Sequence, residues 1–488
     1  MISEPVASPA FDRGLLTPVA VGHDGLVSDE AVLAALVRAE LGLVRAWSLL
    51  GAVQVETADA IATAWGMDAG TDAERDGAAN GDTAGAEVGH PGPDAAPWGA
   101  GSLAIDVAGL AAAAVDGGNP VIPLVSRLKQ AVPPADRTWV HRGATSQDIL
   151  DTAIMLVSRQ AVDAVLSELG TAEASLSAFA AEHRDVVAVG RTLAQHAVPT
   201  TVGLRATVWL TGIRRARTRL RQLTLPVQLG AAAGTRASFL ALGGPGATEL
   251  PARYAETLGL DDAGAVWHTS RWPVTELADA LTQTTDALGK LAGDVITLTR
   301  TEIAELSAGV GGGSSAMPQK SNPVAAVLIR AAALRAPQLA ATMHLCATLA
   351  EDERPAGAWH AEWPTLRELL RLTLAASAHA AQLTAALRVD RDAAARNLDL
   401  TRGLILSERL SIVLAPLIGA ERVATLVAEA ASGADLAALV AALPEAADIN
   451  IPALLDPANY TGDATATVDS ATAGERPSAP HPTDEARS

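Results

Sequence analysis

The residues best suited to chemistry lie in the segment 311–323, which reads Gly-Gly-Gly-Ser-Ser-Ala-Met-Pro-Gln-Lys-Ser-Asn-Pro. Three consecutive glycines allow a mobile backbone that can approach a ligand closely. Ser314 and Ser315 supply hydroxyl groups and Lys320 supplies an ammonium group, beside backbone N–H groups that can hold an anion. A plain linker would not need a lysine in a chain that has only three of them. The segment therefore indicates a loop that binds an anionic substrate.

Two other kinds of glycine-rich loop do not fit this segment. A Walker A phosphate loop requires Gly-Lys-Ser or Gly-Lys-Thr, whereas Gln319 precedes Lys320 here. A dinucleotide-binding loop follows a β-strand, whereas this loop follows an apolar pattern typical of a helix. Both nucleotide-binding interpretations are excluded.

A second polar segment, 141–148, reads His-Arg-Gly-Ala-Thr-Ser-Gln-Asp. Thr145 and Ser146 come directly before a predicted helix, where free N–H groups and hydroxyls favour an anion. The same residues are also ordinary N-caps, so by themselves they do not decide between a binding site and a helix start.

The third segment, 190–201, carries His196 among small and apolar residues. A histidine titrates near neutral pH and can donate or relay a proton. A lone histidine in an apolar setting is more often structural, so residue type alone leaves both roles open for His196.

Together, the three segments resemble the sequence blocks of the fumarase/aspartase superfamily. The loop matches the signature Gly-Ser-Ser-x-Met-Pro-x-Lys-x-Asn-Pro at every fixed position, and 141–148 resembles the block His-x-Gly-x-Thr-Ser-x-Asp. Segment 190–201 contains Gln-His-Ala-x-Pro-Thr-Thr. The resemblance extends from about residue 10 to residue 455, apart from an insertion at 68–101.

The resemblance implies that Ser314 is the base that removes a proton α to a carboxylate, although the sequence does not decide between Ser314 and His196. It implies a homotetramer whose sites draw residues from three subunits, with a small di- or tricarboxylate as substrate and neither a metal nor an organic cofactor. The implied catalytic residues are Ser314, His196 and His141, and the implied substrate-binding residues are Thr145, Ser146, Lys320, Asn322, Arg271, Thr192 and Gln195.

Within the superfamily, several segments resemble the 3-carboxy-cis,cis-muconate cycloisomerases. The lyases carry a catalytic histidine in a His-Asp-Val segment, but the corresponding stretch 117–125 has none. The block 353–363 matches Glu-Arg-x-x-Gly-x-Trp-x-x-Glu-Trp, and 267–271 matches Trp-His-Thr-x-Arg. The resemblance implies reversible conversion of 3-carboxy-cis,cis-muconate to 4-carboxymuconolactone, in protocatechuate catabolism.

The chemistry agrees with the missing histidine. The leaving group in lactone opening is a carboxylate, which is stable at neutral pH without a proton. One acid/base group and stabilisation of the enolate-like intermediate then suffice. Arg142, Gln319 and the pair Trp272-Pro273 depart from the usual cycloisomerase residues and leave a related carboxylated diene or lactone open as substrate. A fumarate-releasing lyase of the adenylosuccinate type and a non-catalytic helical scaffold are the alternatives.

The elements that must position these residues are predicted to be helices. Ala, Leu and Val dominate the apolar residues, and Phe and Tyr together number five. Apolar residues recur at helical spacing over 276–307, 149–179 and 324–349, the last with a pause at Pro337. No strand alternation persists. We expect an all-α fold of three helical domains with a central bundle of long helices.

Composition also divides the chain and limits its partners. The segments 68–101 and 456–488 have few large apolar residues and are predicted to be disordered. The net charge of −19 disfavours nucleic acid and anionic membranes as partners. The single Cys346 excludes an intrachain disulfide and a cysteine-based zinc site. The N-terminal residues lack a signal-peptide pattern and no apolar run reaches the length of a membrane span, so we expect a cytoplasmic protein. The expected sections are an N-terminal helical domain 1–147, a central bundle 148–376 and a C-terminal helical domain 377–455.

Overall fold

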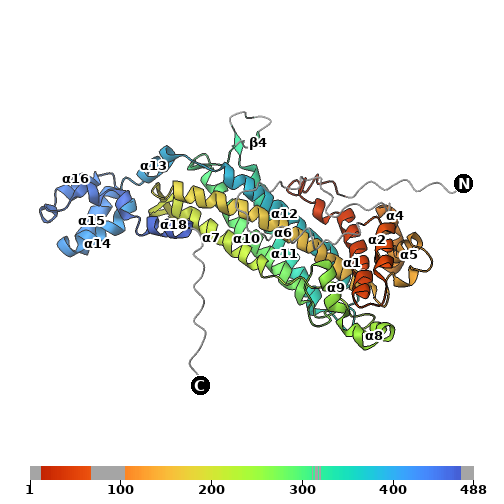
Figure 1. Cartoon of the computed structure of the whole chain (residues 1–488). Helices are drawn as coiled ribbons and strands as arrows, with labels where there is room; N and C mark the ends of the chain where they lie inside the picture. The colour runs from red at the N-terminus through yellow and green to blue at the C-terminus, as the bar shows by residue number, and fades with distance from the viewer. Residues whose placement is uncertain (1–11, 68–104, 310–311, 314–316, 318–319, 474–488) are drawn as a thin grey trace, which may run out of the picture. The chain divides into compact units, whose positions relative to one another are not determined.

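The computed structural model describes residues 12–67, 105–309, 312–313, 317 and 320–473. These residues form a mainly helical fold (Figure 1), which confirms the predicted all-α class. The predicted insertion 68–101 and the last part of the predicted tail, 474–488, lie outside the described residues.

The chain divides into two units, each built from three separate stretches of sequence. The boundaries between the stretches fall inside long helices, so they do not follow the three consecutive sections expected from the sequence, which stay a prediction. Unit 1 comprises Met1–Ser167, Arg217–Asp286 and Ala331–Ala378, and unit 2 comprises Glu168–Ala216, Ala287–Arg330 and His379–Ser488.

Three groups of helices make up the fold. The long helices that contribute residues to both units are α6 (Ser146–Glu182), α7 (Val202–Arg221), α10 (Trp272–Leu298), α11 (Val324–Thr348) and α12 (Ala358–Ala386). The shorter helices of unit 1 are α1 (Asp29–Leu49), α2 (Val55–Ala64), α4 (Val107–Gly117), α5 (Val121–Ala131), α8 (Ala237–Gly243) and α9 (Leu250–Leu258). Those of unit 2 are α13 (Arg391–Asp399), α14 (Ser407–Ile418), α15 (Ala420–Ala431), α16 (Leu436–Ala441), α17 (Ile451–Leu454) and α18 (Ala464–Thr472).

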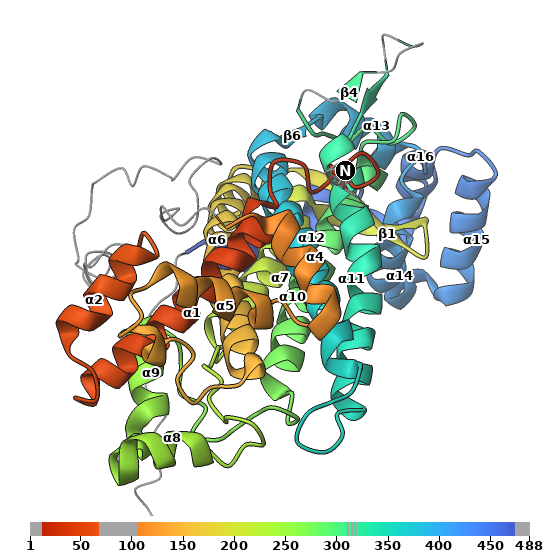
Figure 2. The ribbon, with the colours of Figure 1, turned by 90° about the vertical axis from the view of Figure 1, so that its right-hand side faces the viewer.

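Helix α1 shows how local sequence and packing cooperate in unit 1. The Ser28 hydroxyl accepts a hydrogen bond from the N–H of Ala31 at 3.1 Å and caps the helix. The helix then packs against α9 (Figures 1 and 2), where a Cβ on Gly42 would lie 2.6 Å from a methyl carbon of Leu258. Glycine at position 42 therefore lets the two helices approach this closely without displacing the side chain of Leu258.

The long helices follow the apolar pattern in the sequence, with two corrections: α11 has no pause at Pro337, and α10 ends earlier than predicted. The helix predicted over 149–179 is present as α6, and α11 continues through Pro337 without a break. The helix predicted over 276–307 ends at Leu298. The backbone turns at Ala304, whose φ is 50°, so Leu306 is buried as part of a strand. Periodicity misplaced this end because Leu306 is buried in either conformation.

The sequence predicted no paired strands, and this prediction is wrong for residues 187–201. They form an antiparallel hairpin of β1 (Val187–Thr192) and β2 (Gln195–Thr201) in unit 2. Its turn residues Leu193 and Ala194 have φ values of 48° and 67°, a conformation that normally selects glycine or asparagine. Without either residue at the turn, the hairpin has no recognisable sequence signal. Two-residue strands pair as β3 (Leu306–Ser307) with β6 (Arg388–Val389) and as β4 (Gly312–Gly313) with β5 (Ser321–Asn322).

The segment after residue 456 was predicted to be disordered, and the structure corrects this up to residue 473. Helix α18 buries Val468 completely, and Asp469 forms an ion pair with Arg184 at 2.8 Å. The small residues of α18 at helical spacing are therefore enough for it to pack against the rest of unit 2. Helices α14, α15 and α16 lie together in the same unit (Figure 1), around a core that includes Leu410 and Leu414.

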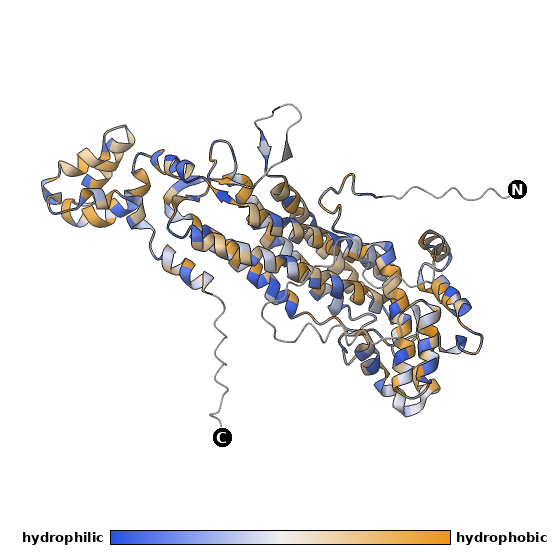
Figure 3. Ribbon diagram, turned by 45° about the horizontal axis from the view of Figure 1, so that its top comes forward, coloured by the Kyte–Doolittle hydropathy of each residue, from blue (hydrophilic) through white to orange (hydrophobic). Residues whose placement is uncertain are grey.

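Hydrophobic and hydrophilic residues share most helices (Figure 3). Among the described residues, α11 is the one helix that is long and apolar enough to cross a membrane by length and composition. Core helices of soluble proteins meet the same criterion, and Arg330 and Arg335 interrupt its apolar sequence. Leu334 and Leu345 are exposed on α11 and form part of an apolar face that no other described residue covers.

Candidate active site

The predicted site residues are divided between the two units. His141, Thr145, Ser146 and Arg271 belong to unit 1. Thr192, Gln195, His196, Lys320 and Asn322 belong to unit 2. Ser314 lies outside the described residues, so its role as the base stays a prediction.

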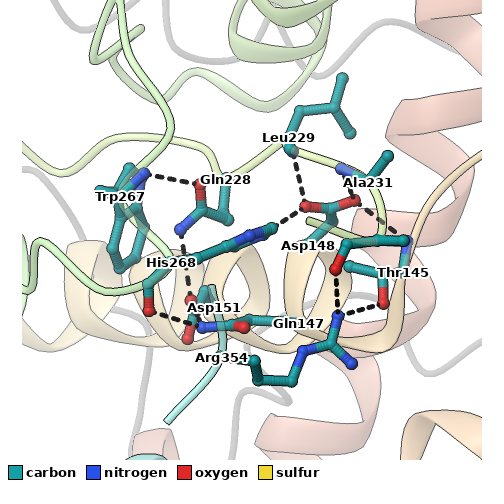
Figure 4. A network of polar contacts seen from close by, with 12 residues as sticks. Thr145, Gln147, Asp148, Asp151, Gln228, Leu229, Ala231, Trp267, His268 and Arg354 are labelled. Atoms are coloured by element: carbon teal, nitrogen blue, oxygen red, sulfur yellow. Dashed lines mark hydrogen bonds and ion pairs between the residues drawn. The ribbon is translucent and has the colours of Figure 1, made fainter. Parts of the chain in front are cut away.

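The N-terminus of α6 is held in place by Asp148, which is fully buried (Figure 4). Its carboxylate accepts hydrogen bonds from the backbone N–H groups of Thr145, Gly230 and Ala231 at 3.0, 2.7 and 3.0 Å. The Nε2 atom of His268 lies 2.9 Å from the same carboxylate. These contacts make Asp148 a buried link between α6 and the segments around Gly230 and His268. They use the backbone N–H of Thr145, so its hydroxyl is left for other partners.

The Thr145 hydroxyl contacts an arginine from a distant part of the chain. The Nη2 atom of Arg354 donates to Thr145 Oγ1 at 2.6 Å and to the carbonyl of Ala232 at 3.4 Å (Figure 4). Arg354 is exposed, and Thr145 and Ser146 are half-buried. Two hydroxyls at the start of α6 and the guanidinium of Arg354 therefore lie together near the protein surface.

His141 is held by a buried carboxylate on α1. Its Nδ1 lies 2.7 Å from Oε1 of Glu40, whose side chain is completely buried. Burial by itself would lower the pKa of His141, but the charge and hydrogen bond of Glu40 outweigh it and the pKa is raised. His141 also has a φ of 59°, which is uncommon for a residue other than glycine. The pair fixes the orientation of a ring that favours its protonated form.

Arg271 is buried between two carboxylates, and its predicted substrate-binding role stays a prediction. Its guanidinium donates to Asp151 at 2.7 and 3.0 Å and to Glu362 at 2.7 Å, and its side chain is 1% exposed. Burial would lower its pKa, but the two carboxylates raise it. The Trp359 indole also donates to Asp151, at 2.9 Å. The charge of Arg271 is thus balanced by two buried acids inside unit 1.

In unit 2, the hairpin β1–β2 carries the next group of predicted residues. Thr192 and Gln195 are exposed and pair directly across the turn, and His196 pairs with Arg191. Burial and the charge of Arg191 lower the pKa of His196, and Glu305 partly opposes them. The His196 ring is therefore neutral at neutral pH and can accept a proton.

Glu305 anchors this hairpin. Its buried carboxylate accepts two hydrogen bonds from Arg191, at 2.5 and 3.2 Å, and one each from Arg205 and Asn397, at 3.4 and 2.9 Å. Burial alone would raise the pKa of Glu305, but these donors lower it, so the carboxylate stays ionised. Neither Glu305 nor Glu40 was predicted from the sequence as part of the site. An acidic residue inside an otherwise apolar stretch, as at Glu40, was the available signal.

Part of the signature loop is described. Strand β5 places Asn322 opposite Gly312, and the N–H of Lys320 donates to the carbonyl of Met317 at 3.0 Å. Lys320 is exposed and Asn322 is half-buried. The ammonium group of Lys320 is therefore accessible to an anion.

The segment without the lyase histidine has a different polar residue. Asn119 is buried, and its Oδ1 accepts the N–H of Val121 at 2.8 Å at the start of α5. An exposed imidazole lies beside this segment, since Nε2 of His360 is 3.7 Å from where a Cβ on Gly118 would be. Among the described residues, no three His, Cys, Asp or Glu side chains are grouped so that they could hold a metal ion.

Comparisons with known proteins identify a family and several relatives. A sequence family described as lyase matches residues 119–337. The nitrosuccinate lyase of Streptomyces davaonensis is 41% identical, over 98% of this chain and 98% of its own length. A 3-carboxy-cis,cis-muconate cycloisomerase of Bradyrhizobium diazoefficiens is 45% identical, over 64% of this chain and 70% of its own length. The crystal structure of the 3-carboxy-cis,cis-muconate lactonizing enzyme from Pseudomonas putida has a TM-score of 0.77 and 33% identity, covering 91% of this chain and 94% of that one.

Proposed function

The chain belongs to the fumarase/aspartase superfamily, and from this membership we propose that it interconverts 3-carboxy-cis,cis-muconate and 4-carboxymuconolactone. In the lactonising direction a carboxylate oxygen of the substrate attacks the alkene and forms the C–O bond. The π electrons move to the carbon α to another carboxylate, and one proton is delivered there. No oxidant or further reactant is needed.

The environment of Asn119 is the observation on which this proposal depends. In a lyase that releases an amine, an acid must protonate the leaving group. Here the side chain at this position is buried and accepts a hydrogen bond from the N–H of Val121 at the start of α5. A carboxylate leaving group needs no such acid at neutral pH. The chemistry therefore fits a reaction in which a stable anion leaves or adds.

We assign the remaining steps to the residues that the sequence resemblance indicates. Ser314 or His196 exchanges the proton, and His196 is suited to accept it because its ring is neutral. Lys320 and Asn322 stabilise the enolate-like intermediate, and Thr145 and Ser146 hold a carboxylate. Thr192 and Gln195 contact the substrate from the exposed tip of the hairpin.

We further propose a cytoplasmic homotetramer whose sites are shared between subunits. The exposed residues Leu334 and Leu345 on α11, and Leu349 directly after it, support this proposal, since an apolar surface of this kind is suited to packing against another copy. Size-exclusion chromatography with light scattering would test it. A monomer at micromolar concentration contradicts it.

A second candidate reaction is elimination of nitrite from nitrosuccinate, which is favoured by the full-length similarity to a nitrosuccinate lyase. A base would remove the proton α to one carboxylate, the C=C bond would form, and nitrite would leave with the electrons of the C–N bond. Nitrite is also stable without a proton, so Asn119 fits this reaction equally well. The same argument disfavours adenylosuccinate.

One assay separates these candidates. Purified full-length protein is incubated separately with 3-carboxy-cis,cis-muconate, nitrosuccinate and adenylosuccinate. Loss of muconate absorbance, with deuterium incorporated from D2O, supports the proposed cycloisomerase. Release of nitrite and fumarate from nitrosuccinate, without muconate turnover, overturns it in favour of the second reaction. Fumarate release from adenylosuccinate alone, or no turnover of any of the three, also overturns it.

A further inference from the structure

A substrate with two or three carboxylates needs cations in the site. One of the cations expected from the sequence, Arg271, is paired with buried acids. Arg271 is enclosed by Asp151 and Glu362, so its charge is already balanced. Ion pairing of this kind leaves no donor directed at a ligand. Another arginine, Arg354, is suited to the role of substrate-binding cation, and this inference rests on the proposed function.

Arg354 contacts the hydroxyl of Thr145, which is predicted to bind the substrate. It lies in the connection between α11 and α12, two residues after Asp352, whose φ is 51°, and three residues before Gly357, whose φ is 84°. These two left-handed residues turn the connection sharply around Arg354. Its guanidinium thereby contacts Thr145 Oγ1 at 2.6 Å (Figure 4).

Arg354 makes no ion pair with an acid in the part of the chain that the structure describes. Its hydrogen bonds go to the neutral oxygens of Thr145 and Ala232. The nearby carboxylate of Asp148 is occupied by three backbone N–H groups and the ring of His268. An exposed guanidinium with neutral partners retains donors for a carboxylate, which it can bind through two parallel hydrogen bonds.

We propose that Arg354, together with the Thr145 hydroxyl, binds a substrate carboxylate remote from the bond that forms and breaks. This carboxylate replaces Ala232 as the partner of the guanidinium. Arg354 thereby selects substrates that carry more than one carboxylate, and it contributes to binding more than to the chemical step.

Kinetics of three variants test this role. In Arg354→Gln, KM for the substrate should rise about ten- to one-hundredfold while kcat changes less than about threefold. Arg354→Lys keeps the charge but loses the paired hydrogen bonds, so its KM should lie between the KM of the wild type and that of Arg354→Gln. Arg253→Gln is the matched control, because Arg253 is an exposed arginine that pairs with Glu256 and Glu249 on α9. An unchanged KM in Arg354→Gln overturns the inference.

Calorimetric binding of fumarate, of tricarballylate and of monomethyl fumarate separates this inference from the proposed function. The wild-type chain should bind at least one of the first two more than tenfold more tightly than the monoester, and Arg354→Gln should lose that preference. If this pattern holds but no proposed substrate is turned over, the proposed function fails and the role of Arg354 stands. If turnover occurs and the preference is absent, or survives the substitution, the role of Arg354 fails alone.

Discussion

The imidazole of His141 and the carboxylate of Glu40 form a pair 2.7 Å apart, although the two residues are 101 positions apart in the sequence. Helix α1 supplies the acid, and the polar segment before α6 supplies the ring. Because Glu40 is fully buried, its orientation is fixed by packing. The ring of His141 is thereby held in an uncommon backbone conformation that its own sequence would not favour.

Replacement of Glu40 by Gln should lower the pKa of His141. The pKa of His141 is raised above the ordinary value of 6.5, so the pair stabilises the fold most below pH 6.5 and the contribution disappears as pH rises through the folded-state pKa. We therefore expect Glu40→Gln to destabilise the protein by about 1–3 kcal/mol at pH 5.5 and by less at pH 8.5. Urea unfolding at both pH values, with NMR titration of the ring, measures this. A larger loss at pH 8.5 would contradict it.

Replacement of Arg271 by Met should damage stability. The change leaves Asp151 and Glu362 buried without their cation, which typically costs about 3–5 kcal/mol. Thermal and urea unfolding should show this loss, and Arg253→Gln, an exposed control, should stay near wild type. Normal stability combined with a raised KM would instead restore a substrate-binding role for Arg271.

Replacement of Arg191 by Gln should raise the pKa of His196, because the positive charge of Arg191 contributes to lowering it. The pH at which the His196 ring loses its proton should then move upward, and the acidic limb of kcat/KM should follow it if His196 accepts the proton. Arg191→Lys keeps the charge and serves as the control. A pH profile that stays in place while the NMR titration shifts would leave Ser314 as the base.

Replacement of His360 by Gln should have little effect on turnover. His360 is exposed beside Gly118, where a histidine of the lyase kind would be expected to act. Because the proposed leaving group needs no proton, kcat should change less than about threefold. Steady-state kinetics with the active substrate measure this. A loss of about one hundredfold would show that an acid is required and would refute the argument based on Asn119.

Local sequence determined some of these features and not others. Helix α6 was predictable because its apolar spacing is regular over many turns and its start is marked by Thr145 and Ser146. The hairpin was not predictable, since Leu193 and Ala194 adopt a turn that their side chains disfavour. That conformation is maintained by contacts outside the turn, such as those of Glu305 with Arg191.

The two arginines show the same limit for the site. Arg271 and Arg354 both belong to segments that resemble the cycloisomerase blocks, and residue type does not distinguish them. The difference arises because Asp151 and Glu362, which are 120 and 91 positions away from Arg271, enclose only that arginine. Pairing over such separations depends on the finished fold, so the sequence alone could not assign the substrate cation.

The three-part composition of unit 1 has a consequence for synthesis on the ribosome. Asp151, Arg271 and Glu362 come from its first, second and third stretches. While the nascent chain is shorter than about 362 residues, Arg271 lacks one of its two acids, and the ribosomal tunnel delays Glu362 further. The ion-pair cluster of unit 1 can therefore be completed only after roughly three quarters of the polypeptide has been translated, and apolar surface that stays exposed until then favours aggregation.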